Sequence, residues 1–536
     1  MVNNTRFWSW AALGAVALSV SFMIACGGSG AGGSAIAPPP PGPNTSSAPT
    51  VAPSPVVSGP YFIVDAAAAR HAISPDIYGI SFFYSGPHAA AQYSFAQTVH
   101  LTANRIGGDA TTRYNWQYDS SNSGRDWYFV GGNGQSSVTP GASMDAIIAK
   151  DIAVGAKTIM TIPMIEYINN SAAWHCSFPE SVYGAQTSYD PYLHPSGDNC
   201  GNGVLTSGQL IPQESPIVSD VPNSPSIQDA WVSHLVGKFG SAASGGVPIY
   251  EMDNEPSGWQ AIHRDVHPAV STCSEIQTQT LAYAPGIKAT DPTAKVLGPD
   301  DIPAADVLTC GAVTGRGLWY LQLMAAYQQQ HGARLLDYFG LHYPGWGSGD
   351  PILNAAARIK LHQGWIASAY PGTKLAYDEY DWGSAEGTLA ETLMTADGLG
   401  LFGQQGVDLA SYWGLSDPSS DSTAFAFLMF RNYDGKGSQF GDTSIQVNAG
   451  AAGGLEVYGA QRTYDGAVTT IVLNRKSSAL SATFVLKDHT AKGPAQVYQY
   501  SQANLSVIVH GPNQTMSGST LSMSYPANSA TLVVVP

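Results

Sequence analysis

Eight short β-like runs, each followed by a longer stretch compatible with a helix, constrain the fold of this chain more than any other feature. The runs cover 77–83, 103–108, 157–164, 248–254, 296–299, 338–343, 375–379 and 409–413. Alternating β and α units predict a parallel sheet, and eight such units are the number that closes a (β/α)8 barrel. About 350 residues is generous for this barrel, so we expect long loops, with 166–226 as the clearest insertion.

The helical period disappears after residue 440. Short β-like runs follow, separated by Gly, Asn, Ser and Pro, at 455–462, 467–474, 482–486, 496–500, 505–509 and 531–535. Such spacing predicts an attached all-β sandwich. We therefore assign 75–440 to the catalytic barrel, 441–536 to the sandwich, and 59–74 to an N-terminal segment whose strand joins the sandwich.

The first 26 residues are predicted to be an export signal. Arg6 precedes an apolar run that ends at Cys26, and two glycines follow. This resembles a bacterial lipobox, whose cysteine is lipidated and becomes the mature N-terminus; an ordinary cleaved signal peptide is the alternative. Residues 27–58 are rich in Pro, Ser and Gly and predict an extended linker. We expect a secreted protein, or an outer-surface lipoprotein of a bacterium tethered to the membrane through Cys26.

Four further cysteines are expected to form disulfides, because export places them in an oxidising compartment. Four cysteines allow three pairings. Proximity in the sequence favours Cys176 with Cys200 and Cys273 with Cys310. No Cys-x-x-Cys spacing occurs, so a cysteine zinc site is not expected.

The charge balance argues against a nucleic-acid-binding surface. Lys and Arg number 23 against 39 Asp and Glu, which gives a net charge of −16. Only 12% of the residues are charged, whereas the chain holds 12 Trp and 27 Tyr. This composition is typical of an exported protein that acts on an uncharged ligand.

Two of the eight runs end in a glutamate that is suited to acid–base chemistry. The fourth run leads into Asn254-Glu255-Pro256, and the seventh ends at Glu379. Strands four and seven lie on opposite sides of an eight-stranded barrel, and catalytic residues lie at the carboxyl ends of the strands. Cleavage of a glycosidic bond needs two carboxyl groups that face each other across the anomeric carbon. Either glutamate alone could cap a helix or pair with an arginine, but together they predict a glycosidase.

Several collinear segments, which together span about Tyr61 to the C-terminus, resemble glycoside hydrolase family 44, a clan A family of retaining glycosidases. They are Ile77-Tyr78-Gly79, Asn104-Arg105-Ile106-Gly107-Gly108 with Thr112-Arg113-Tyr114-Asn115-Trp116, Asp253-Asn254-Glu255-Pro256 with His267-Pro268, Glu379-Tyr380-Asp381-Trp382-Gly383, and Phe430-Arg431-Asn432-Tyr433-Asp434-Gly435 with Phe440-Gly441-Asp442. The resemblance implies a (β/α)8 barrel with a β-sandwich. It also implies endo action on a plant cell-wall β-1,4-glucan, often xyloglucan, with xylan as a secondary substrate. By position, Glu255 becomes the general acid/base and Glu379 the nucleophile.

Two aspartates flank the predicted nucleophile. Strand alternation places Glu379 and Asp381 on one face and Asp378 on the other. Because Asp381 lies further into the loop, Glu379 is preferred. A retaining pair should have carboxyl groups roughly 5 to 5.5 Å apart. The pKa of Glu255 should be raised by burial or by the charge of Glu379.

The neighbours of the two glutamates supply candidate binding residues. Asn254 is a candidate for the sugar 2-hydroxyl, and Tyr343 for a hydrogen bond to Glu379. Arg105 is expected to hold Glu379 ionised, with a structural ion pair as the alternative; His342 is either a site residue or a hydrogen-bonded core histidine. Aromatic rings match the apolar faces of sugars. The candidates for stacking, with core packing as the alternative, are Trp116, Trp259, Trp382 and Trp413.

Two carboxylates require no cofactor, and the ligands of any metal are unknown. A structural calcium is one option, with oxygen ligands drawn from Asp119, Asp126, Asp300 and Asp301. A monomer is expected. The alternatives are a surface lipoprotein that binds oligosaccharides without hydrolysis, and a transglycosylase that uses the same residues. No Gly-x-Ser-x-Gly motif lies on a predicted strand, which argues against a serine hydrolase. The sequence does not rank xyloglucan, other β-glucans, mannan and xylan.

Overall fold

A computed structural model describes residues 58–192, 194 and 197–536. Residues Gly59–Pro536 form one compact unit. The predicted signal, Cys26 and nearly all of the linker lie outside the described residues. Within the described part, no helix combines the length and apolarity needed to cross a membrane.

The barrel closes as predicted, with its eight strands side by side in chain order. Neighbouring strands are parallel throughout. The strands are β3 (Gly79–Ile80), β4 (Ala103–Ile106), β6 (Lys157–Ile162), β10 (Ile249–Met252), β11 (Lys295–Asp301), β14 (Tyr338–His342), β15 (Lys374–Tyr380) and β16 (Leu409–Tyr412).

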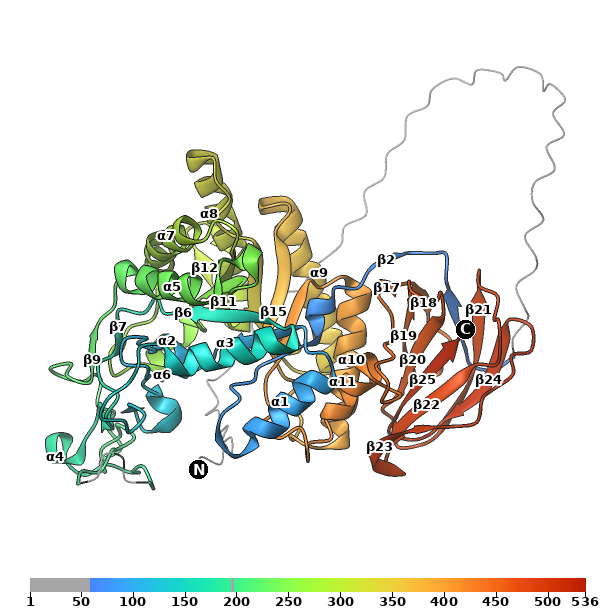
Figure 1. The fold of residues 1–536 in the computed structure, drawn as a ribbon, viewed down its shortest axis with the longest axis horizontal. Helices are drawn as coiled ribbons and strands as arrows, with labels where there is room; N and C mark the ends of the chain where they lie inside the picture. The colour runs from blue at the N-terminus through green and yellow to red at the C-terminus, as the bar shows by residue number, and fades with distance from the viewer. Residues whose placement is uncertain (1–57, 193, 195–196) are drawn as a thin grey trace, which may run out of the picture. The chain divides into compact units, whose positions relative to one another are not determined.

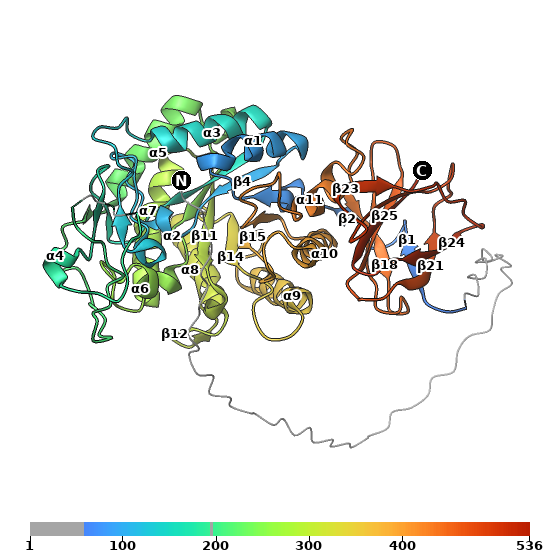
Figure 2. The same ribbon diagram turned by 90° about the horizontal axis from the view of Figure 1, so that it is seen from below.

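One main helix follows each barrel strand, and these helices surround the sheet (Figures 1 and 2). They are α1 (Ala89–Thr98), α3 (Ala142–Val154), α5 (Pro225–Phe239), α7 (Cys273–Thr290), α8 (Arg316–His331), α9 (Pro351–Ala369), α10 (Leu389–Gln405) and α11 (Ala424–Arg431). The fold class predicted from the alternating pattern is therefore confirmed.

The barrel interior has an apolar floor with a polar layer above it. Seven buried side chains form the floor: Ala103, Ile159, Ile249, Leu297, Tyr338, Ala376 and Leu409. Residues two positions further along a strand point to the same side. On five of these strands that position holds a buried polar residue: Arg105, Thr161, Glu251, Asp378 and Ser411. The polar layer lies directly below the carboxyl ends of the strands, where the site is expected.

The C-terminal sandwich consists of two sheets. One has the order β2-β17-β19-β20-β25-β22-β23 and the other β18-β1-β21-β24. Their bounds are β1 (Tyr61–Asp65), β2 (His71–Ala72), β17 (Thr443–Ser444), β18 (Gln446–Asn448), β19 (Glu456–Gln461), β20 (Val468–Asn474), β21 (Leu480–Lys487), β22 (Gln496–Ser501), β23 (Asn504–His510), β24 (Thr520–Tyr525) and β25 (Ser529–Val535). As expected, the N-terminal strand β1 joins the sandwich, pairing in parallel with β21. Sequence reasoning missed β24, in which Leu521 and Tyr525 are buried and Ser522 and Ser524 are exposed.

Polar and aromatic contacts join the sandwich to the barrel through α10 and α11. The Tyr458 hydroxyl donates to Asp397 of α10 at 2.6 Å, and Nε of Arg475 lies 2.9 Å from the same carboxylate. Phe425 of α11 stacks on Tyr500, with ring centroids 4.5 Å apart. The buried carboxylate and the stacked rings indicate a fused module that braces the barrel.

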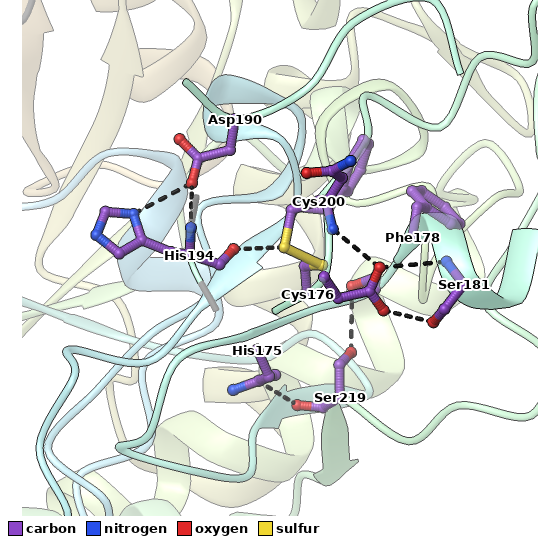
Figure 3. Close-up of a disulfide and its surroundings, with 12 residues drawn as sticks. His175, Cys176, Phe178, Ser181, Asp190, His194, Cys200 and Ser219 are labelled. Carbon is purple, nitrogen blue, oxygen red and sulfur yellow. Dashed lines mark hydrogen bonds and ion pairs between the residues drawn. A yellow bond between two sulfur atoms is a disulfide. The ribbon is translucent and has the colours of Figure 1, made fainter. Parts of the chain in front are cut away.

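The predicted insertion folds over the loop that follows β4. Strand β7 (Tyr167–Asn169) pairs with β9 (Asp220–Pro222), and β5 (Val130–Gly131) pairs with β8 (His175–Cys176). A disulfide joins Cys176 to Cys200 within the insertion, near the short helix α4 (Glu180–Tyr183) (Figure 3). A second disulfide joins Cys273, the first residue of α7, to Cys310. These are the two pairings that proximity favoured.

We expect Arg475→Met to lower the free energy of unfolding by about 1–3 kcal/mol, because it removes the cation beside the buried Asp397. Burial raises the pKa of Asp397 to about 7 even with Arg475 present. A carboxyl group whose folded pKa is raised favours folding at low pH and loses that contribution as the pH rises. The variant should therefore lose more stability at pH 8 than at pH 5 in thermal unfolding. Lys476→Met, at an exposed neighbour, is the control; equal melting temperatures would contradict the bracing role.

Candidate active site

Glu255 and Glu379 meet at the carboxyl ends of β10 and β15. One carboxylate oxygen of each lies within 4.8 Å of the other. Four non-glycine residues around them have left-handed backbone angles: Asp253 (φ 66°), Glu255 (45°), Asp300 (57°) and Tyr343 (44°). Such conformations cost free energy in non-glycine residues and cluster at functional sites. The chain thus bends sharply where three barrel strands end, and these bends aim the side chains at one point.

Arg105 on β4 lies at the centre of the polar layer and is completely buried. Its guanidinium donates to both oxygens of Glu251, at 2.8 and 2.6 Å, and to Asn254 Oδ1 at 2.7 Å. It also donates to Asp300 at 2.9 Å and to Glu379. As predicted, Arg105 contacts the candidate nucleophile. Its burial excludes direct contact with a substrate, so it acts through the carboxylates that it binds.

Three groups hold Glu379 in its ionised form. Burial alone would raise the pKa of this carboxyl group, but the positive charges of His342 and Arg105 and the hydrogen bonds from Tyr343 and Arg105 outweigh burial and lower it. The Tyr343 hydroxyl donates to Oε1 of Glu379, and Arg105 donates to Oε2. An ionised carboxylate in this position is suited to nucleophilic attack.

Glu255 has the opposite tendency. Burial and the negative charge of Glu379 raise its pKa, and they outweigh the lowering effect of His342. Its Oε1 lies 2.8 Å from Nδ1 of His342. The side chain is 16% exposed, so it can reach a substrate. A carboxyl group that keeps its proton beside an ionised one forms an acid and nucleophile pair.

The prediction that Asp378 points away from Glu379 is wrong. Asp378 Oδ2 lies 3.8 Å from Nε of Arg105, and Glu379 also contacts Arg105. The pairing register of β15 shifts against both of its neighbours. Against β14 the shift lies between Gly340 and His342 of β14, and against β16 it lies between Tyr377 and Tyr380 of β15. This irregularity breaks strict alternation and turns two consecutive acidic side chains toward the same cation.

Two of the four predicted aromatic platforms are wrong. Trp259 is 1% exposed and donates its indole N–H to the Asn254 carbonyl at 3.2 Å. Trp382 is 5% exposed and packs against Tyr380 and Phe402. Rings this deeply buried leave no open face on which a sugar could stack.

The remaining candidates occupy different positions. Trp116 is half-buried and donates to the carbonyl of Ile227 at 3.0 Å, so it packs on α5. Trp413 is half-buried over Gly108, where an added Cβ atom would come within 2.7 Å of the ring. The N–H of Gly108 donates to Asn254 Oδ1 at 3.1 Å, which places Trp413 beside the site. Trp413 is therefore the best placed of the four for substrate contact.

Asn254 has most of its hydrogen-bonding capacity occupied. Its Oδ1 accepts from Arg105 and Gly108, and its Nδ2 donates to Asp109 at 2.9 Å. One amide hydrogen remains for a ligand. The predicted contact with a sugar hydroxyl stays a prediction.

Sequence reasoning gave no active-site role to several acids around the site, although it named Asp126 and Asp300 as calcium candidates. Glu251 is the main partner of Arg105, and Asp300 lies between Arg105 and His342. Asp109 and Asp126 face the glutamates; burial raises the pKa of both, and the negative charge of Glu379 raises them further. Asp109 and Asp300 directly follow predicted strands, and that position was the available signal; Glu251 lies within the predicted strand 248–254.

Two sets of side chains in the described part come close enough to share a metal ion: Glu255, His342 and Glu379, and Asp300, His342 and Asp378. The first contains the two candidate catalytic carboxyl groups, and both nitrogens of His342 already face carboxylates. The four acids considered for calcium do not converge. Asp119 accepts from Tyr114 and Ser143, and Asp301 pairs with Arg316 at 2.7 Å.

A closed (β/α)8 barrel with two opposed glutamates at the ends of its fourth and seventh strands defines a barrel glycosidase. A model of glycoside hydrolase family 44 matches residues 120–344. The crystal structure of CelM2, a bifunctional glucanase-xylanase from a metagenome library, is similar to that of this chain, with a TM-score of 0.81 and 34% sequence identity. The match covers 89% of this chain and 99% of CelM2. The chain belongs to glycoside hydrolase family 44, and it is an endo-acting glycosidase.

Further relatives are consistent with this assignment. A family 44 endoglucanase from Clostridium acetobutylium is 25% identical, with a TM-score of 0.72 over 89% of this chain and 99% of that chain. Endoglucanase A of Paenibacillus lautus is 26% identical over 547 aligned residues, which cover 88% of this chain and 72% of that protein. These relatives therefore favour a glycosidase over the alternative of a lipoprotein that binds oligosaccharides without hydrolysis.

We expect Tyr343→Phe to reduce kcat/KM about 10- to 100-fold, because a hydrogen bond to a charged group contributes about 1.5–3 kcal/mol. Loss of this donor should raise the pKa of Glu379. Since Glu379 must be ionised, the acidic limb of the pH profile of kcat/KM should move to higher pH, while the basic limb stays in place. Tyr464→Phe in the sandwich is the control. An unchanged acidic limb would show that Tyr343 does not set the ionisation of Glu379.

Proposed function

We propose that this chain is an exported endo-β-1,4-glucanase that retains anomeric configuration and works by double displacement. The observation that carries this proposal is the pair Glu255 and Glu379, with carboxylate oxygens within 4.8 Å and pKa values shifted in opposite directions. This separation favours a retaining mechanism, because inverting enzymes need roughly 6.5–9.5 Å to place a water molecule between the carboxyl groups.

In the first step, Glu379 attacks the anomeric carbon while Glu255 gives its proton to the leaving oxygen. In the second step, Glu255 takes a proton from water, and the water oxygen replaces Glu379 on the anomeric carbon. Arg105 and Tyr343 orient Glu379, one hydrogen bond to each oxygen. The free amide hydrogen of Asn254 is available for the sugar 2-hydroxyl, and Trp413 offers an aromatic face.

The proposed substrate is the β-1,4-linked glucan backbone, as in cellulose-type, xyloglucan or mixed-linkage polymers. Support comes from the names of two relatives, the endoglucanase A of Paenibacillus lautus and the glucanase-xylanase CelM2. The 34% identity to CelM2 favours xylan as a second substrate. Xylan keeps the β-1,4 linkage and lacks only the hydroxymethyl group of each glucose unit.

We expect the purified chain to release reducing ends from carboxymethyl cellulose, xyloglucan or mixed-linkage glucan, with xylan and mannan tested in parallel. Glu379→Gln should lose at least about 10⁴-fold in kcat. Glu255→Gln should lose about 10²- to 10⁴-fold on polymers but much less in the first step with a dinitrophenyl cellobioside, whose leaving group needs no proton. Glu456→Gln in the sandwich is the control.

The stereochemistry of the first product tests the mechanism. Proton NMR during early turnover should show the β-anomer, and azide should rescue Glu255→Ala as a β-glycosyl azide. Formation of the α-anomer would overturn double displacement. A folded protein that is inactive on every polymer would overturn the assigned substrate class.

We also propose export, with lipidation at Cys26 as the route to a membrane tether. Two disulfides support an oxidising compartment. In a bacterial host, Cys26→Ser should abolish incorporation of labelled palmitate and move the protein from the detergent-soluble membrane fraction to the aqueous one. Lys476→Ser is the control. An unlabelled wild-type protein that is released into the medium would instead identify an ordinary cleaved signal peptide.

A further inference from the structure

The imidazole of His342 lies between the two glutamates. One ligand atom each of His342, Glu255 and Glu379 lies within 4.8 Å of the others. Nδ1 of His342 is 2.8 Å from Glu255 Oε1, and Nε2 is 3.0 Å from Asp300 Oδ1. Both contacts are direct, and the side chain of His342 is completely buried.

A carboxyl oxygen lies at each ring nitrogen, and a doubly protonated ring can donate to both of them. A neutral imidazole has one N–H and one acceptor, whereas the imidazolium donates from both nitrogens. Donation to Oε1 of Glu255 leaves the other oxygen of that group free to carry the acid proton. One arrangement thus satisfies both contacts and keeps Glu255 ready to protonate a leaving group.

The partner behind His342 is a pair of buried carboxyl groups. Asp300 and Asp378 are both fully buried, and both have oxygens within 4.8 Å of a nitrogen of His342 and of each other. Among the described residues, no donor forms a hydrogen bond to either oxygen of Asp378, and Nε of Arg105 lies 3.8 Å from its Oδ2. A buried carboxylate without a hydrogen bond is costly, whereas a protonated Asp378 can donate to Asp300. Burial and the charge of Glu251 raise the pKa of Asp300, and burial and the charge of Asp300 raise that of Asp378. The pair therefore shares at least one proton, and with that proton on Asp378 the negative charge beside His342 belongs to Asp300.

We propose that His342 is an imidazolium counter-ion, held by Asp300, which stabilises Glu379 in the resting enzyme and Glu255 in the glycosyl-enzyme intermediate. This inference rests on the proposed double displacement. His342 acts as a positioning residue, because it contacts the reacting carboxyl groups and not the sugar.

The charges balance over the first step. The bond from Glu379 to the anomeric carbon forms, the bond to the leaving oxygen breaks, and the proton of Glu255 moves to that oxygen. Glu379 thereby loses one negative charge, and Glu255 gains one. The imidazolium faces one catalytic anion before the step and one after it, so its own proton need not move. In the second step water attacks, its proton passes to Glu255, and the charge returns to Glu379.

The charged groups that face His342 come from four strands. Glu255 follows β10, Asp300 lies on β11, Glu379 lies on β15, and Arg105 lies on β4; Glu251 is also within electrostatic range. Burial and Arg105 lower the pKa of His342, but the carboxylates Glu379 and Glu255 outweigh them and raise it. The balance of these neighbours therefore favours the protonated ring.

The chain contains a matched control. His362 is also buried, with Nδ1 2.8 Å from the Tyr377 hydroxyl and Nε2 3.0 Å from Asp306. Its position on α9, outside the strands, separates it from the two glutamates. His362→Gln and Asp306→Asn therefore test the loss of a buried histidine pair without touching the reaction.

The first test is direct. In protein labelled with ¹⁵N-histidine, both ring nitrogens of His342 should show imidazolium shifts at pH 7, in the free enzyme and in a trapped 2-fluoro-glycosyl enzyme. His342→Gln identifies the signals. A neutral ring in either state would overturn the inference.

The second test uses the pH profile of kcat/KM. His342→Gln and Asp300→Asn remove the cation or its anchor, so the pKa values of both Glu379 and Glu255 should rise. Both limbs of the profile should then move to higher pH, whereas Tyr343→Phe moves the acidic limb alone. His362→Gln and Asp306→Asn should leave both limbs in place. If folded His342→Gln leaves both limbs of the pH profile in place, the inference is overturned. The proposed function is judged separately, by anomeric retention and by the loss of activity in Glu379→Gln.

Discussion

The rest of the site depends on one buried cation, the guanidinium of Arg105 on the barrel axis. Removing a guanidinium from water costs several kcal/mol, and only close, well-oriented acceptors offset that cost. The barrel supplies them from three other strands and the segment that follows one of them: Glu251 and Asn254, Asp300, and Glu379. Because one rigid planar group binds all four, their side chains share a single geometry. The nucleophile is thus placed by the same interaction that makes the charged layer stable.

Two chemically identical glutamates acquire opposite roles from the donors around them. Glu379 receives hydrogen bonds from Arg105 and Tyr343, which favour its ionised form. Within the part of the chain that the structure describes, Glu255 forms no hydrogen bond with an arginine, and its charged partner is His342. Burial acts on both groups in the same direction, so the number and kind of donors decide the difference. The proposed roles of acid and nucleophile therefore follow from the barrel delivering its strongest donors to one side of the site.

The sequence was sufficient for the order of the eight strands, the pairing of β1 with the sandwich, and the positions of Glu255 and Glu379. These depend on periodicity and on the rule that parallel strands end on one face. It was not sufficient to predict the direction in which Asp378 points. The shifted register of β15 arises from its pairing with β14 and β16, and the local sequence pattern carries no sign of it. Likewise, the position of His342 behind Glu255 depends on left-handed bends at Glu255 and Asp300. Such bends follow from tertiary contacts, since glutamate rarely adopts them and aspartate does so only in a minority of cases.

Glycines decide which of the predicted aromatic residues can meet a sugar, and this too required the structure. An added Cβ atom on Gly398 of α10 would come within 1.9 Å of the ring of Trp382, and one on Gly345 within 3.0 Å. The helix therefore approaches Trp382 closely and covers it. Gly108 instead makes room for Trp413 next to Asn254. Two tryptophans that follow neighbouring strands thus have different uses: the first fixes α10 against the barrel, and the second leaves part of its ring exposed beside the catalytic pair. Among the four predicted platforms, Trp413, which rests on a glycine of the site itself, is accordingly the one that we propose for contact with the polysaccharide.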